Sequence, residues 1–197
     1  IPDCSETSWK ANYTNEGGYG GSYRYLKNIM GLWMLQSLRK EWDKKYSFEE
    51  LARLAEENRG FPARVEVNDH SFLSPNSMVQ AVKDYCASIG QKVPETDGEI
   101  ISVVYLSLAE SYCRTVEELE NLTGQKYHEI RIVGGGCRDR YLNRLTAERA
   151  ARKVCAGPVE ATAIGNLIAQ LLGTGKIRSV KEAKEIISRS FEIAVFE

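Results

Sequence analysis

Apolar residues recur every three to four positions through most of the chain, which is the spacing of helices with one buried face. The first such run extends from Ser22, a suitable helix N-cap, to about Trp42, and we expect one helix there. Ser47 and Glu50 have the spacing of a capping box and predict the start of a second helix. Further helices are expected after Pro75 up to Gly90 and over residues 97–122, 138–153, 160–172 and 179–191.

The periodicity changes at residues 128–133, where the alternating sequence HEIRIV predicts a short strand. Residues 154–156 form a second candidate strand, and the helix expected between the two completes a βαβ unit. Residues 1–21 and 61–72 are rich in polar and turn-forming residues, and we expect turns and loop there. The whole pattern indicates an α/β protein that is rich in helix, with a small sheet in its C-terminal half.

Three consecutive glycines, Gly134, Gly135 and Gly136, follow the first predicted strand and precede a helix. A turn without side chains lets a ligand lie on the backbone, and the helix start offers free N–H groups. Open α/β sheets bind nucleotides at such turns. The dinucleotide fingerprint is incomplete, because Asp139 stands where its third glycine belongs, and no Walker A sequence occurs in this region. From these residues alone, a ligand-binding turn and a purely structural turn are about equally supported.

A second segment of interest, residues 157–166, carries small residues at Ala161, Ala163 and Gly165. A helix face of this kind permits close approach of another backbone. The approaching element is either another helix or the glycine turn. On general grounds, packing against a helix is the more common use.

Two amides stand out on the helix expected over residues 22–42. Asn28 and Gln36 are eight residues apart, a little over two helical turns, and their neighbours are apolar. Buried amides need hydrogen-bond partners from the protein or from a ligand. The pair therefore predicts a polar group nearby, without identifying it.

Composition and charge exclude several classes of protein. The 197 residues include 26 basic and 27 acidic side chains, so the formal net charge is −1. No strong basic field is available for nucleic acid or for a membrane surface, and we expect neither partner. The longest apolar runs, residues 29–35 and 100–109, are too short to span a bilayer.

The cysteines and histidines predict neither a disulfide framework nor a metal site. Five cysteines are scattered without a CxxC pair, which favours a reducing cytoplasm. The two histidines, His70 and His128, have no second histidine or cysteine at ligand spacing. We therefore expect no metal bound by side chains of this chain alone.

Six motifs in chain order resemble one enzyme family. They are TNEGG with SYRYLKNIMGLW (14–18 and 22–33), FLSP with Met78 (72–78), residues 94–100, SLA (107–109), VGGG (133–136) and residues 157–166. Their sequence and order are similar to those of the FGGY carbohydrate kinases, and in particular to the subgroup that acts on rhamnulose. The resemblance covers nearly the whole chain.

The resemblance implies a protein of two actin-like, ribonuclease-H-like lobes with the active site between them. Residues 1–197 correspond to the C-terminal, nucleotide-side lobe, without its first strands and without the N-terminal lobe. The first residue is Ile1 rather than Met, which agrees with a chain truncated at its N-terminus. The family's catalytic aspartate precedes this region, so no residue here is expected to be catalytic.

The implied reaction is ATP-dependent phosphorylation of a ketose, L-rhamnulose to L-rhamnulose 1-phosphate. Mg²⁺ would be held mainly through the phosphates and the other lobe. The implied partners are ATP or ADP, the sugar and the protein's own N-terminal lobe. Because phosphoryl transfer depends on positioning both substrates in one cleft, this lobe alone is expected to be inactive.

The site residues carried over from the family are binding and support residues. Gly134, Gly135, Gly136 and Gln36 match nucleotide-binding positions, and Asn28 matches a position near the sugar or the transferred phosphate. The segment that supports the glycine turn and the hinge between lobes matches Gly157, Pro158, Glu160, Ala161, Thr162, Gly165 and Asn166.

The chain departs from the family pattern just after the glycines. It has Arg138-Asp139 and Asn143-Arg144, where the family has a polar residue with Asn and then Asn-Gln. Two guanidinium groups near an adenine pocket put the family's purine contacts in doubt, although Arg can also stack on a base.

Two alternatives to the rhamnulose kinase stay open. One is another FGGY kinase, of the fuculose or xylulose type, and another is a non-catalytic module that binds a nucleotide or a partner protein.

A lobe without its first strands would also expose a strand edge and an apolar patch, so we expect self-association.

Overall fold

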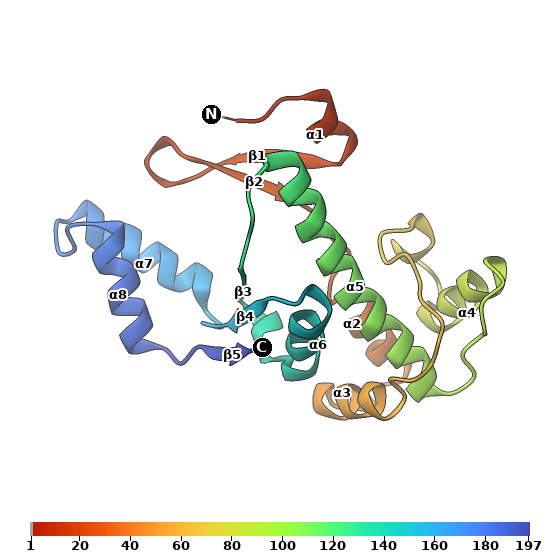
Figure 1. Cartoon of the computed structure of the whole chain (residues 1–197). Helices are drawn as coiled ribbons and strands as arrows, with labels where there is room; N and C mark the ends of the chain where they lie inside the picture. The colour runs from red at the N-terminus through yellow and green to blue at the C-terminus, as the bar shows by residue number, and fades with distance from the viewer. Residues whose placement is uncertain (1) are drawn as a thin grey trace.

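The computed structural model describes residues 2–197. Figure 1 shows the long helix α5 crossing the middle of the molecule, with smaller elements on both sides. The helices and strands follow the chain in the order α1 (Glu6–Lys10), β1 (Tyr13–Gly17), β2 (Tyr23–Lys27), α2 (Trp33–Glu41), α3 (Phe48–Glu57), α4 (Met78–Ser88), α5 (Asp97–Thr123), β3 (Glu129–Ile132), α6 (Arg140–Ala150), β4 (Lys153–Ala156), α7 (Ala161–Gly173), α8 (Val180–Ser190) and β5 (Ala194–Phe196). Short 3₁₀ turns occur at Tyr19–Gly21, His70–Phe72 and Gly135–Arg138.

The helix ends agree with the local sequence signals. Ser47 and Glu50 form the expected capping box of α3, each receiving a backbone N–H of the other. Thr96 and Glu99 form a second capping box at the start of α5. This helix ends at Gly124, whose φ of +68° is left-handed and suits glycine. The helices expected from residue 47 onward are therefore all confirmed within a few residues.

The single helix expected over residues 22–42 is wrong. Residues 23–27 form β2, which pairs with β1 in antiparallel register from Tyr13 opposite Lys27 to Gly17 opposite Tyr23. The rings of Tyr13 and Tyr25 stack with centroids 4.6 Å apart, a diagonal cross-strand contact. The aromatic residues therefore serve a hairpin, and the helix begins only at Trp33. Ser22 is extended rather than an N-cap.

Helix α5 is the centre of the main core. From Ile100 to Ala109 every side chain is buried, and α2, α3, α4, α6 and the loop after α3 pack around it. Two serines inside the helix are satisfied, since Ser107 accepts the Val65 amide at 2.9 Å and Ser102 donates to the Asn58 carbonyl. Within residues 2–197, no helix is both long and apolar enough to cross a membrane.

The second half contains the expected βαβ unit. Strands β3 and β4 are parallel, paired from Glu129 opposite Lys153 to Ile132 opposite Ala156, with α6 as the connection. β5, which the sequence pattern did not predict, pairs antiparallel with β4. β1–β2 and β3–β4–β5 are separate sheets, so in the described residues 2–197 β1, β2, β3 and β5 each have one unpaired edge.

Helices α7 and α8, drawn in blue at the left of Figure 1, lie apart from the helices α2 to α6. α7 consists largely of apolar and small residues, yet it has no buried residue. Gly165 has nothing within 4 Å of the position that a Cβ would take. Within residues 2–197 no other helix packs on this small-residue face, so the packing expected for it stays a prediction.

Candidate functional site

The glycine turn lies at the carboxyl end of β3, where an open sheet exposes its loops. Gly134 has φ +76° and ψ −162°, a region open essentially to glycine alone. Gly135 starts a short 3₁₀ turn, and its position would leave a Cβ without any atom within 4 Å. A Cβ on Gly136 would meet Leu32 at 3.6 Å. The turn therefore has one glycine whose backbone conformation requires glycine and one glycine that faces open space.

The end of β4 braces this turn through backbone hydrogen bonds. The Gly157 amide donates to the Ile132 carbonyl at 2.8 Å, and the Gly134 amide donates to the Pro158 carbonyl at 3.2 Å. Gly157 has φ +127°, and a Cβ there would lie 2.9 Å from the Glu192 carbonyl oxygen. The structure thus brings the two segments singled out by the sequence into direct contact at Gly134 and Pro158.

The rest of the second segment does not reach the glycine turn. Glu160 precedes α7 without making a side-chain cap, and its carbonyl accepts the Ile164 amide at 3.0 Å. Ala161 is partly buried, whereas Thr162, Gly165 and Asn166 are exposed. Support of the turn is therefore made by the backbone before α7 rather than by the helix.

Gln36 and Asn28 are not the buried pair that the sequence pattern predicted. Gln36 lies on α2, whereas Asn28 follows β2 in the loop that leads to α2, and both residues are exposed. Gln36 lies one helical turn beyond Leu32, the residue that faces Gly136. The start of α2 is thus next to the glycine turn, while Asn28 belongs to the hairpin side of the molecule.

Asp139 has a structural role beside the glycine turn that the sequence analysis did not assign to it. Its carboxylate caps α6 by accepting the Leu142 amide at 2.9 Å, and it also accepts the hydroxyl of Tyr105 on α5 at 2.7 Å. Burial raises the pKa of the Asp139 carboxyl above its usual value. Burial, and then the Asp139 charge, raise the pKa of Tyr105, so its hydroxyl stays a proton donor. An Asp directly before a helical run was the available signal.

The side chains that follow the glycine turn make contacts within the protein. Arg144 in particular does not point toward the turn, where the sequence analysis had considered an arginine beside an adenine. Asn143 is buried, and its side-chain amide donates to the Cys137 carbonyl at 3.0 Å, which holds the 3₁₀ turn against α6. Arg144 points to α3, where it pairs with Glu56, and its guanidinium lies 5.4 Å from the Tyr141 ring. Arg138 remains at the exposed end of the turn. The Arg144 guanidinium thus contacts α3 and Tyr141 rather than the glycine turn.

The described residues 2–197 contain no group of three or more side chains suited to hold a metal ion. Two surface hollows, of about 570 and 410 Å³, lie along α5 beside the β1–β2 end and are lined by residues such as Lys10, Lys27, Arg114 and Glu118. Neither hollow includes a residue of the glycine turn. At Gly135 the turn faces open space, with no atom within 4 Å of the Cβ position.

The fold and the glycine turn define the class of protein. Residues 2–174 match the family model described as the C-terminal domain of the FGGY family of carbohydrate kinases, and the chain belongs to this family. It corresponds to the actin-like, ribonuclease-H-like second lobe of that family, and it is rich in helix with small sheets.

The individual relatives are more specific. The chain is 44% identical over 98% of its length to a rhamnulokinase of Halalkalibacterium halodurans, of which it covers 41%. It is 46% identical to the rhamnulokinase of Ligilactobacillus salivarius and 38% identical to that of Bacillus subtilis, in each case over 40% of the relative. The chain thus spans about two fifths of the length of the curated relatives it matches.

Proposed function

We propose that residues 1–197 form the nucleotide-side lobe of an ATP-dependent carbohydrate kinase that phosphorylates L-rhamnulose to L-rhamnulose 1-phosphate. The observation that carries this proposal is the glycine turn at the carboxyl end of β3, braced by Gly157 and Pro158. The names of the relatives support the sugar, and the family match supports the kinase class. A kinase for another ketose, such as fuculose or xylulose, is the alternative that a substrate assay decides.

The open space at Gly135 fits a nucleotide. With no atom within 4 Å of the Cβ position, a base, ribose or phosphate can lie directly against the backbone. The amides of the turn are potential donors to phosphate oxygens or to the nucleoside. Gln36 is the nearby side chain that we assign to the nucleotide, and Asn28 is assigned to the sugar side. Gly134 and Gly136 hold the turn in shape.

The described residues do not fit Mg²⁺ by themselves, because they offer no cluster of carboxylates. We therefore assign the ion to the phosphates of ATP and to residues outside this chain. ATP supplies the phosphoryl group, and this lobe binds and orients the nucleotide. The catalytic base is likewise assigned to the part of the protein outside residues 1–197, so the lobe alone is inactive.

Two kinds of exposed surface, strand edges and an apolar helix face, suit the rest of such a kinase. The edges of β1 and β3 are unpaired in residues 2–197, and α7 exposes an apolar face without buried side chains. Unpaired edges and apolar patches of this kind are normally covered. We infer that the protein's own N-terminal part covers them, with residues 157–166 at the junction of the lobes.

Calorimetric titration with ADP tests the nucleotide site. We compare the unchanged chain with Gly135→Val and with Gly60→Val, a matched control at an exposed glycine that also has open space around its Cβ position. Binding by the chain and by Gly60→Val, together with loss of binding in Gly135→Val, is the expected result. If Gly135→Val binds as tightly as the chain, the glycine turn is not the nucleotide site.

The substrate is tested separately on the lobe joined to the N-terminal part of the protein. ATP-dependent phosphate transfer is measured with L-rhamnulose, L-fuculose and D-xylulose under equal conditions. The highest kcat/KM is expected for L-rhamnulose. Nucleotide binding without transfer to any of these sugars would favour the non-catalytic module.

A further inference from the structure

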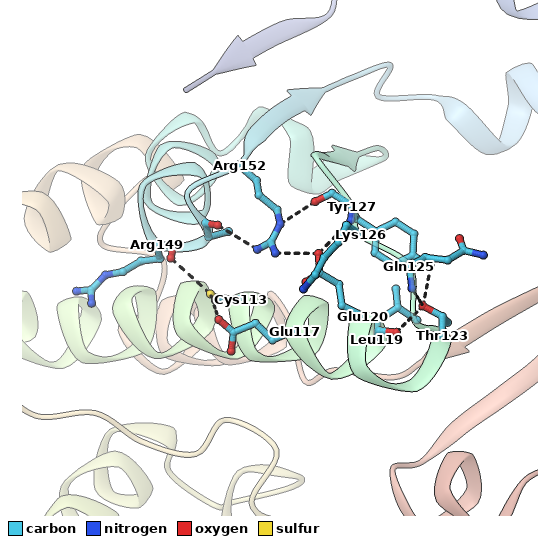
Figure 2. Close-up of polar contacts among 11 residues, drawn as sticks. Cys113, Glu117, Leu119, Glu120, Thr123, Gln125, Lys126, Tyr127, Arg149 and Arg152 are labelled. Atoms are coloured by element: carbon cyan, nitrogen blue, oxygen red, sulfur yellow. Dashed lines mark hydrogen bonds and ion pairs between the residues drawn. The ribbon is translucent and has the colours of Figure 1, made fainter.

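The two parallel strands that lead to the glycine turn and to the segment that braces it begin at one cluster of charged side chains, shown in Figure 2. Tyr127 lies two residues before β3, and Arg152 directly precedes β4. Arg152 donates from Nε to the Tyr127 carbonyl at 2.7 Å, and from Nη2 to a carboxylate oxygen of Glu120 at 2.9 Å. The same Glu120 oxygen accepts the Tyr127 amide at 3.0 Å. Both backbone groups of Tyr127 are thus held by one ion pair.

Glu120 belongs to α5, so the cluster joins three elements. Its side chain is only 4% exposed, and that of Arg152 is 18% exposed. The second carboxylate oxygen accepts Lys126 at 2.7 Å. A third bond of Arg152, from Nη1 to the Ala150 carbonyl at 3.0 Å, ties the guanidinium to the end of α6. The carboxylate and the guanidinium are therefore both satisfied, which is a condition for a buried pair to hold a defined geometry.

The register of β3 against β4 rests on few other contacts. The pair has only four matched positions, from Glu129 opposite Lys153 to Ile132 opposite Ala156. The other edge of β3 is unpaired within the described chain. Each residue of slip moves a strand by about 3.3 Å and turns its side chains to the other face. A short strand with one free edge needs an anchor, and the cluster supplies it at the start.

The far ends of these two strands are the glycine turn and its brace. β3 is followed by Gly134, and β4 is followed by Gly157. The hydrogen bonds from the Gly157 amide to the Ile132 carbonyl and from the Gly134 amide to the Pro158 carbonyl join the two ends. A slip at Tyr127 would misalign these bonds at the other end. We propose that Glu120 and Arg152 are positioning residues, which set the register of β3 against β4 and so place the glycine turn for nucleotide. The nucleotide part of this inference rests on the proposed function.

The variants Glu120→Gln and Arg152→Lys test the cluster without large loss of volume. Glutamine removes the charge that attracts both cations, and lysine keeps the charge but cannot form the fork that reaches Tyr127 and Glu120 together. The matched control is Glu118→Gln, on the same helix α5 as Glu120. It breaks the 2.6 Å ion pair of Glu118 with Lys27 of β2. Two readouts are used, the amide hydrogen exchange of Gly134 and Gly157 without ligand, and the dissociation constant for ADP.

We expect exchange at the Gly134 and Gly157 amides to be about three- to thirtyfold faster in both test variants, with a similar weakening of ADP binding. Glu118→Gln should leave both readouts unchanged, even where it lowers the free energy of unfolding by a similar amount. Unchanged glycine amides in the two test variants, or an equal effect of Glu118→Gln, would overturn the positioning role.

The two proposals fail in different ways. If the unchanged chain does not bind ADP, the proposed nucleotide site fails, while faster exchange at the glycine amides still supports the register role. If the chain binds ADP and both test variants bind it equally well with unchanged amides, only the positioning role fails. Should Glu120→Gln not fold, Arg152→Lys still supplies both readouts.

Discussion

The amide nitrogen of Gly134 donates a hydrogen bond to the carbonyl oxygen of Pro158 over 3.2 Å. This bond joins the loops after two parallel strands, and it defines the edge of the candidate nucleotide site. Since Gly134 also has a backbone conformation that only glycine adopts easily, its role is to shape the turn. Gly135, in contrast, faces open space and is the residue available for contact.

The two glycines should therefore respond differently to alanine. Gly134→Ala is expected to lower the free energy of unfolding by about 1–3 kcal/mol, because the left-handed extended backbone is strained for any residue with a Cβ. Gly135→Ala has no such strain and room for its methyl group, so it should change stability by less than about 0.5 kcal/mol. Urea unfolding measures both. Equal losses would show that the turn is not held as the structure has it.

The pair of Asp139 and Tyr105 should be energetically coupled. Asp139→Ala removes the α6 cap, worth about 0.5–2 kcal/mol, and leaves the buried Tyr105 hydroxyl without its acceptor. Tyr105→Phe removes only the shared bond. A double-mutant cycle from urea unfolding is expected to give a coupling of about 0.5–3 kcal/mol. Additive effects would mean that the two side chains do not interact in solution.

The loss of stability at acid pH should depend on Glu120. Lys126, then the Tyr127 amide and Arg152, lower its pKa from 4.5 to about 2. A carboxyl with a lowered folded pKa stabilises the fold above its unfolded pKa, and this contribution is lost as the pH falls from about 4.5 to about 2. Glu120→Gln lacks the contribution at every pH, so its free energy of unfolding should fall less steeply through this window. Parallel curves for the two proteins would contradict this.

The exposed apolar helix α7 should drive self-association of this chain. Leu167 is 57% exposed on a helix without buried residues, and such a surface is prone to bind a second copy when nothing covers it. Sedimentation over a range of concentrations is expected to show association, which Leu167→Lys reduces. Leu73→Lys, at a leucine that is 63% exposed outside α7, is the control and should change little. A monomer at all concentrations would refute the prediction.

The sequence by itself determined the features that depend on near neighbours. The capping box of Ser47 and Glu50, the stop of α5 at Gly124 and the strand–glycine–helix order around Gly134 were all read from residues a few positions apart. Helix caps and glycine turns are made by hydrogen bonds and dihedral angles within one or two turns of chain, so their signals are local.

Only the tertiary structure decided which distant residues meet. Residues 23–27 became a strand because β1 is present to pair with them, and β5 formed because it reached the free edge of β4. The bond of Tyr105 to Asp139 and the clamp of Glu120 with Arg152 join residues more than thirty positions apart. Strand partners and buried polar contacts have energies that depend on the path of the whole chain, and short-range periodicity contains no record of that path.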